Sequence, residues 1–138
     1  MASSGFSRFE IALEDEAATH RFAADIGNAL EPGDFVTLSG DLGAGKTTFA
    51  RALIRALAKD PTVAVPSPTF TLMQSYDLPR FTLLHADLYR ITGPDELDEL
   101  GLEDHSDQSV VVMEWPDRAG NRLPVDRIDI SFTLSPKH

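Results

Sequence analysis

The spacing of apolar residues predicts three helices separated by extended segments. Apolar side chains recur at every fourth position between 16 and 30, which is typical of an amphipathic helix, and Pro32-Gly33 is expected to end it. A second helix is predicted over 47–58, where Ala, Leu and Arg dominate and the apolar residues share one side. A short acidic helix is expected after Gly93-Pro94, because proline is well tolerated in the first helical turn.

Alternating or continuous apolar runs predict the strands. The run of valines in 109–113 indicates a strand buried on both faces, and strict alternation in 128–134 indicates a half-exposed one. A short link at 77–80 favours a hairpin between its neighbours. The predicted strands are 9–13, 34–38, 70–76, 81–86, 109–113 and 128–134. Together these elements predict an α/β fold in which a mixed sheet, with parallel central strands and antiparallel edges, is flanked by helices.

A glycine-rich segment lies between a predicted strand and a predicted helix. Residues 40–47, Gly-Asp-Leu-Gly-Ala-Gly-Lys-Thr, match the eight-residue P-loop pattern at every required position. Its glycines allow backbone N–H groups to turn inward around phosphates, and the following helix directs its positive dipole end at them. Lys46 is expected to contact the β- and γ-phosphates and the Thr47 hydroxyl to coordinate Mg²⁺. The segment therefore predicts a nucleoside triphosphate site, expected to hold ATP.

Two carboxylates follow predicted strands and are candidates for the acidic group that such a site requires. Glu114 ends one apolar run and Asp87 ends another. Parallel strands bring their carboxyl ends to the edge where the glycine loop lies. We assign Glu114 to the magnesium shell and Asp87 to water positioning or the outer metal shell. A solvated strand end is the alternative for each residue.

Composition narrows the class of protein. The 138 residues suit one domain, 1–138, with 42% hydrophobic and 25% charged residues. No apolar stretch approaches the ~20 residues of a membrane span, and the absence of cysteine fits a cytoplasmic location. Twelve Lys and Arg face 22 Asp and Glu, a formal net charge of −10. Because nucleic-acid binding usually needs a basic face, we expect a partner to make any contact with nucleic acid.

Four motifs together resemble the TsaE family, the small bacterial P-loop ATPases of the tRNA threonylcarbamoyladenosine pathway. The motifs are 40–48 (GDLGAGKTT), 67–70 (SPTF), 85–90 (HADLYR) and 114–116 (EWP), in family order over roughly residues 15–134. The resemblance implies action with TsaB and TsaD, while TsaC makes threonylcarbamoyl-adenylate. The implied target is adenosine 37 of tRNAs that read ANN codons, reached through the partners.

The resemblance also implies roles for individual residues. Thr69 would lie in a switch-like loop near the γ-phosphate, and an ordinary ordered loop residue is the alternative. Thr19 matches a family threonine that touches nucleotide. The expected nucleotide contacts are Thr19, Asp41, Leu42, Gly43, Ala44, Gly45, Lys46, Thr47 and Thr48. The expected catalytic residues are Lys46, Thr69, Asp87 and Glu114, and the expected metal ligands are Thr47 and Glu114.

Other residues of these motifs leave alternatives open. Trp115 follows Glu114 and should report on nucleotide, although a core tryptophan is an equal alternative. Arg90 and Arg118 are candidates for charge stabilisation or partner contacts, and His85 is favoured as a hydrogen-bonded strand residue. Family members commonly continue past the last strand, so we transfer no role to Lys137.

Two other classes of function remain open. A small-molecule kinase usually carries an arginine-bearing lid, yet 91–108 is short, acidic and free of arginine. A nucleotide-gated binding protein would hold ATP without hydrolysing it. With no strong catalytic base or certain arginine finger, an ATPase is expected to turn over slowly alone and faster in its complex. GTP is a lesser alternative because no Asn-Lys-x-Asp signature is present.

Overall fold

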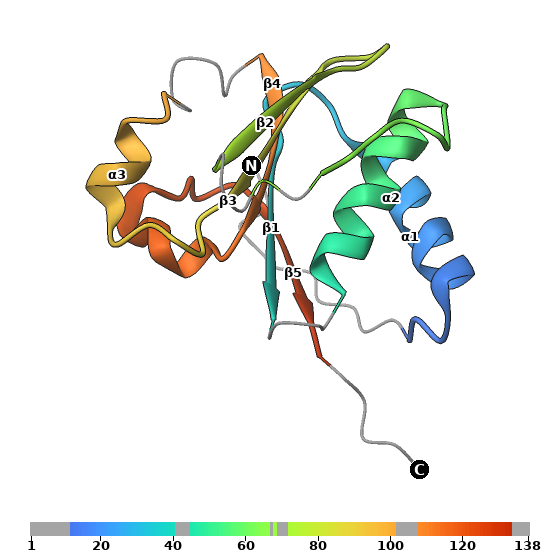
Figure 1. Cartoon of the computed structure of the whole chain (residues 1–138), viewed down its shortest axis with the longest axis horizontal. Coiled ribbons are helices and arrows are strands. Elements are labelled where there is room, and N and C mark those ends of the chain that lie inside the picture. Colours follow the sequence, from blue (N-terminus) through green and yellow to red (C-terminus); the bar gives the residue numbers. More distant parts are fainter. Residues whose placement is uncertain (1–11, 41–44, 67, 69–71, 102–107, 134–138) are drawn as a thin grey trace, which may run out of the picture.

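A five-stranded sheet in the order β2-β3-β4-β1-β5 forms the centre of the protein (Figure 1). The computed structural model describes residues 12–40, 45–66, 68, 72–101 and 108–133. The strands are β1 (Phe35–Gly40), β2 (Met73–Asp77), β3 (Thr82–Asp87), β4 (Ser109–Glu114) and β5 (Ile128–Phe132). The helices are α1 (Glu16–Ala29), α2 (Lys46–Ala58), α3 (Pro94–Asp98) and the 3-10 segment η2 (Pro116–Arg122).

The pairing of strands confirms the predicted mixed sheet and refines its edges. Strands β3, β4, β1 and β5 are mutually parallel, and β2 pairs antiparallel with β3. The predicted hairpin is therefore present, and β2 forms an antiparallel edge. The other edge strand, β5, is parallel, because the chain crosses over through η2 before it rejoins the sheet.

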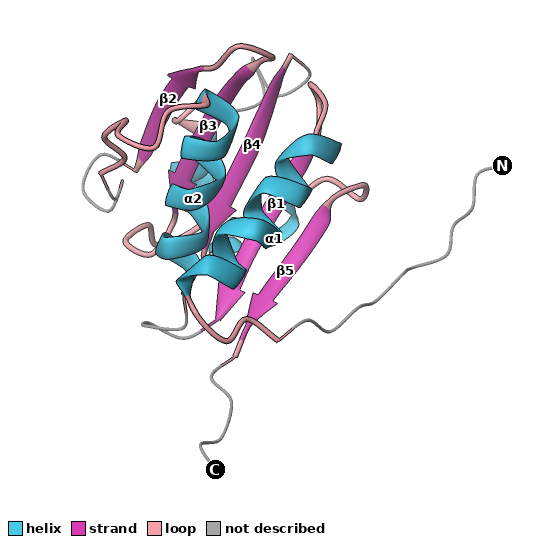
Figure 2. Cartoon of the chain, turned by 90° about the vertical axis from the view of Figure 1, so that its right-hand side faces the viewer, coloured by secondary structure: helices cyan, strands magenta, loops and turns pink. Residues whose placement is uncertain are grey.

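Helices cover both faces of the sheet. Figure 2 shows α1 and α2 side by side over one face, and α3 and η2 lie on the opposite face in Figure 1. Side chains along each strand alternate between these two cores. In β4, Val110 and Val112 pack with α1 and α2, whereas Val111 and Met113 pack on the side of α3 and η2. Burial on both faces explains why β4 reads as a continuous apolar run.

Helices α1 and α2 run in the same direction and begin at the same edge of the sheet (Figure 1). The rings of Phe22, in the middle of α1, and Phe49, in the first turn of α2, have centroids 5.4 Å apart. Farther along, Gly27 lies so close to α2 that an added Cβ would sit 3.2 Å from the Leu57 side chain. The carboxyl ends of β1 and β5 point to the edge where these helices begin (Figure 1).

The predicted first strand differs from the structure where it can be compared. Most of 9–13 lies outside the described residues, and Leu13 packs against the core without belonging to a strand. Position 134, predicted to end the last strand, also lies outside them. In the described part of the chain, none of the helices has the length and apolar character needed to cross a lipid bilayer.

Arg80, in the β2–β3 turn, stabilises the end of α1. Its guanidinium donates to the carbonyl oxygens of Gly27, at 2.8 Å, and Leu30. The last turn of α1 carries no basic residue of its own. The Gly27 carbonyl also accepts from the Leu30 N–H at 3.2 Å, so Arg80 adds a charged donor at this helix end and interacts favourably with the helix dipole.

We expect Arg80→Ala to lower the free energy of unfolding by about 1 kcal/mol, because the α1 carbonyls lose a charged donor. Arg21→Ala, on the exposed side of α1, is the matched control and should change it by less than about 0.5 kcal/mol. Urea unfolding followed by circular dichroism measures both. Equal stability of the two variants would contradict the capping role.

Candidate functional site

The glycine loop connects the carboxyl end of β1 to the first turn of α2. Gly40 is the last residue of β1, Gly45 is the N-cap of α2, and Lys46 is its first residue. Gly40 has φ 135° and Gly45 has φ 110°, conformations that favour glycine. The predicted contacts Asp41, Leu42, Gly43 and Ala44 lie outside the described residues. The described ends nevertheless place the start of α2, with the N–H groups of its first turn, at the edge of the sheet.

The Lys46 side chain reaches back to the end of β1. Its Nζ donates to the carbonyl oxygen of Gly40, and the same atom lies 4.2 Å from the centroid of the Trp115 ring. The residue is only 5% exposed, which is rare for lysine unless the charge is compensated. The lysine ammonium is thus held between the end of β1 and Trp115, the residue that follows β4.

Asp87 and Glu114 lie side by side at the ends of neighbouring strands. They are register partners in the parallel pair β3–β4, and both are buried. By the alternation of each strand, both side chains project toward the α2 face of the sheet. Asp87 Oδ1 accepts a 2.9 Å hydrogen bond from the Tyr89 N–H, which turns the chain after β3. The structure therefore brings both predicted carboxylates to the edge where α2 begins, while their catalytic roles stay predictions.

His85 makes a buried contact with Glu114 at this edge. Its Nε2 lies 2.7 Å from Glu114 Oε2, and the two side chains are 1% and 3% exposed. The sequence favoured His85 as a hydrogen-bonded strand residue, and the structure supplies Glu114 as its partner. Strand alternation puts His85 on the same face as Asp87, two positions earlier in β3.

An aromatic layer connects Lys46 to the surface. The rings of Trp115 and Tyr89 have centroids 5.0 Å apart, and the Arg118 guanidinium lies 5.8 Å from the Tyr89 ring. Arg118 also donates to the carbonyl of Ile91 at 3.2 Å. Trp115 has φ 58°, an unfavourable conformation for a bulky residue, which indicates that its position is imposed by its surroundings. Trp115 is thus half-buried beside Lys46 and is no ordinary core residue.

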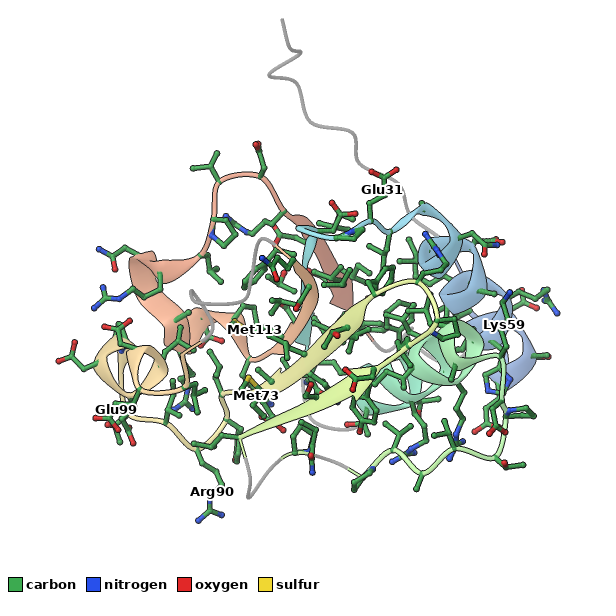
Figure 3. All side chains as sticks on the ribbon, turned by 90° about the horizontal axis from the view of Figure 1, so that it is seen from above. Glu31, Lys59, Met73, Arg90, Glu99 and Met113 are labelled. Atoms are coloured by element: carbon green, nitrogen blue, oxygen red, sulfur yellow. The ribbon has the colours of Figure 1, made fainter. Side chains whose placement is uncertain are left out.

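Sequence reasoning gave Tyr89 no role of its own. The signal available was its position two residues after Asp87 in the same motif. Arg90 is exposed and projects outward in Figure 3, away from the sheet.

The predicted threonines differ in how far the structure places them. Thr47 and Thr48 lie in the first turn of α2, half-buried beside Lys46. Thr19 lies in α1 at the same end of the molecule, where its hydroxyl donates to the Asp15 carbonyl at 3.4 Å. Thr69 lies outside the described residues. Contacts of these threonines with nucleotide remain predictions.

Backbone hydrogen bonds connect the loop around Thr69 to the acidic edge. The Leu72 N–H donates to the Pro68 carbonyl at 2.7 Å, and the Asp87 N–H donates to the Leu72 carbonyl at 2.9 Å. Leu72 itself has φ 69°, which is uncommon for leucine. Pro68 and Leu72 are therefore linked to the end of β3 through backbone hydrogen bonds.

The oxygen atoms available at this edge suit a hard divalent cation that is bound jointly by the protein and by a phosphate ligand. Thr47 and Glu114 offer oxygen atoms, the ligands that Mg²⁺ prefers. Among the described residues, no group of three or more His, Cys, Asp or Glu side chains forms a complete metal cage. Mg²⁺ bound by one or two protein oxygens together with substrate phosphates and water requires no such cage.

Comparisons with known proteins agree on one family. The family model described as "Threonylcarbamoyl adenosine biosynthesis protein TsaE" matches residues 13–138. The chain is 39% identical over 122 residues to a tRNA threonylcarbamoyladenosine biosynthesis protein TsaE of Rickettsia bellii, covering 88% of this chain and 84% of the relative. It is 42% identical over 101 residues to the TsaE protein of Bacillus subtilis, covering 72% and 61%. The crystal structure of YdiB from Bacillus subtilis superposes with a TM-score of 0.67 at 31% identity, covering 85% of this chain and 70% of that one.

We expect Gly40→Ala to lower the free energy of unfolding by about 2 kcal/mol or more, through strain at positive φ and a clash. The new Cβ would lie 2.4 Å from the carbonyl oxygen of Phe132, a backbone atom of β5. Gly93→Ala is the matched control, because nothing lies within 4 Å of its Cβ and its φ of −179° is open to any residue. Its cost should stay below about 1 kcal/mol. Thermal unfolding that ranks the two variants equally would contradict the strain at Gly40.

Proposed function

This chain belongs to the TsaE family, and we propose that it is the ATP-binding and ATP-hydrolysing subunit of tRNA threonylcarbamoyladenosine biosynthesis. Membership supports the role in that pathway. The observation that carries the catalytic proposal is that buried Lys46 and two buried carboxylates, Asp87 and Glu114, lie at the same edge of the sheet, where α2 begins. One cation at the start of a helix and two carboxylates at strand ends form the arrangement that phosphoryl transfer requires.

The proposed reaction is in-line attack of water on the γ-phosphate of ATP. Lys46 and the N–H groups at the start of α2 would bind the β- and γ-phosphates and stabilise the charge that grows on their oxygens. Lys46 would exchange its contacts with the Gly40 carbonyl and the Trp115 ring for contacts with phosphate. Bound Mg²⁺, held by Thr47 and Glu114, would supply further stabilisation of that charge.

The two carboxylates take different parts in this proposal. Glu114 is the more buried and would orient toward the metal. Asp87, whose Oδ1 is already used by the Tyr89 N–H, would position the attacking water or bind in the outer metal shell. The backbone connection from Asp87 through Leu72 to Pro68 supports a route by which Thr69 and its loop would sense the γ-phosphate.

The partners follow from the pathway. We propose that TsaB and TsaD bind this subunit and complete the site, so that hydrolysis is slow alone and faster in the complex. A net charge of −10 supports contact with tRNA through those partners, since a protein that binds phosphate backbones itself is usually basic on one face.

Reconstitution of tRNA threonylcarbamoylation tests the proposal. Lys46→Ala and Glu114→Gln should each lower ATP turnover by about 100-fold or more, because each removes stabilisation of transition-state charge or its metal. Both should also stop repeated cycles of tRNA modification. The matched controls are Lys59→Asn, at the other end of α2 in a conformation that asparagine tolerates, and Glu99→Gln, an exposed carboxylate (Figure 3). Repeated modification without this protein would refute the pathway role.

Phosphate release and calorimetry separate the rival functions. An ATPase releases phosphate with ATP and water alone, a kinase requires an acceptor, and a binding protein takes up ATP without releasing phosphate. Absence of ATP or ADP binding in the presence of Mg²⁺ would refute the proposal entirely.

We expect the fluorescence of Trp115 to change when ATP and Mg²⁺ are added. Trp115 is the only tryptophan of the chain, and its ring lies 4.2 Å from the Lys46 ammonium that phosphate would recruit. A titration midpoint equal to that from calorimetry would support the assignment. Trp115→Phe should abolish the signal, and an unchanged spectrum at saturating ATP would contradict this placement of Lys46.

A further inference from the structure

We infer that His85 is a positioning residue, which holds Glu114 in the orientation that the metal requires. This inference rests on the proposed function, in which Glu114 binds the metal. It deepens that proposal by giving a role to His85, which the sequence favoured as an ordinary strand residue. The observation behind it is the 2.7 Å contact between His85 Nε2 and Glu114 Oε2 inside the protein.

The register of strands β3 and β4 places His85 within reach of Glu114. Asp87 is the direct neighbour of Glu114 across β3–β4, and His85 pairs with Val112, one pair earlier on the same face. The imidazole therefore contacts Glu114 diagonally across the β3–β4 pair, from a position two residues before the end of β3. Because an ionised carboxylate only accepts hydrogen bonds, the contact suits an Nε2–H of His85 that donates to Glu114.

The contact uses one oxygen of the carboxylate. Among the described residues, the hydrogen bond to His85 is the one that Glu114 makes through its side chain, and it engages Oε2. Oε1 is the oxygen that would remain for the metal. A glutamate has several rotatable bonds, so anchoring Oε2 removes rotamers that would turn Oε1 away from the start of α2.

Stability alone is a poor explanation for the pair. His85 Nδ1 is buried and has no hydrogen-bond partner among the described residues, which carries a desolvation cost. Apolar residues of similar volume often replace a buried polar pair at no cost in stability. The surrounding core, with Leu83 and Val112 fully buried, would accommodate such a replacement. Hydrogen bonds that orient metal ligands, by contrast, commonly change metal affinity by about 10–100-fold.

Mn²⁺ binding measured by electron paramagnetic resonance, on the full chain saturated with ADP, tests the inference without turnover. His85→Phe should weaken Mn²⁺ binding about 10-fold or more, because Glu114 loses its anchor. Calorimetry of ADP with EDTA should show unchanged affinity, because Lys46 and the start of α2 are intact. An equal loss of metal-free ADP binding would indicate a merely structural role and overturn the inference.

A matched pair of amides keeps the test decisive if His85→Phe fails to fold. His85→Gln places an amide N–H near the position of Nε2 and should retain most of the Mn²⁺ affinity. His85→Asn has the same chemistry with a shorter reach and should behave like His85→Phe. Equal Mn²⁺ affinity in the two amide variants would overturn the inference.

A double-mutant cycle identifies the residue through which His85 acts. In a Glu114→Gln background, His85→Phe should cause no further loss of Mn²⁺ affinity, whereas independent roles would give additive losses. Failure of the wild-type protein to bind ADP with Mn²⁺ would refute the proposed function itself. Normal wild-type binding with an unaffected His85→Phe variant would refute only the role of His85.

Discussion

The parallel register of β3, β4 and β1 is the constraint on which the candidate site depends. It brings the carboxyl ends of three strands to one edge, so that Asp87, Glu114 and Gly40 meet although they are distant in sequence. The chain then turns from Gly40 into α2, whose first residue is Lys46. A cation and two buried carboxylates are thereby brought to the edge where the first turn of a helix also lies.

Hydrophobic burial on both faces of the sheet maintains this geometry. Helices α1 and α2 cover one core and α3 with η2 the other, so β4 is enclosed on both sides (Figures 1 and 2). A strand buried on both faces cannot slip by one residue without exchanging every side chain between the two cores. The position of Glu114 is therefore fixed by the packing of the valines that precede it.

The site concentrates features that cost folding free energy. Trp115 and Leu72 have positive φ, Gly40 meets the backbone of β5 closely, and Lys46, Asp87 and Glu114 are charged groups removed from water. Such features persist only where the surrounding packing imposes them. Their clustering at one edge, while the rest of the sheet follows ordinary alternation, supports the choice of this edge as the candidate functional site.

Sequence pattern alone was enough to predict the helices α1, α2 and α3, the β2–β3 hairpin, the buried character of β4 and the glycine-rich motif. These depend on periodicity and backbone freedom, which are properties of neighbouring residues. Three features became visible only in the folded chain. Strand β5 joins the sheet in parallel, Arg80 caps α1 at a sequence separation of 50 residues, and His85 contacts Glu114 at a sequence separation of 29 residues. Contacts of this kind depend on strand order and register, which the burial of two whole faces selects and no short stretch of sequence encodes.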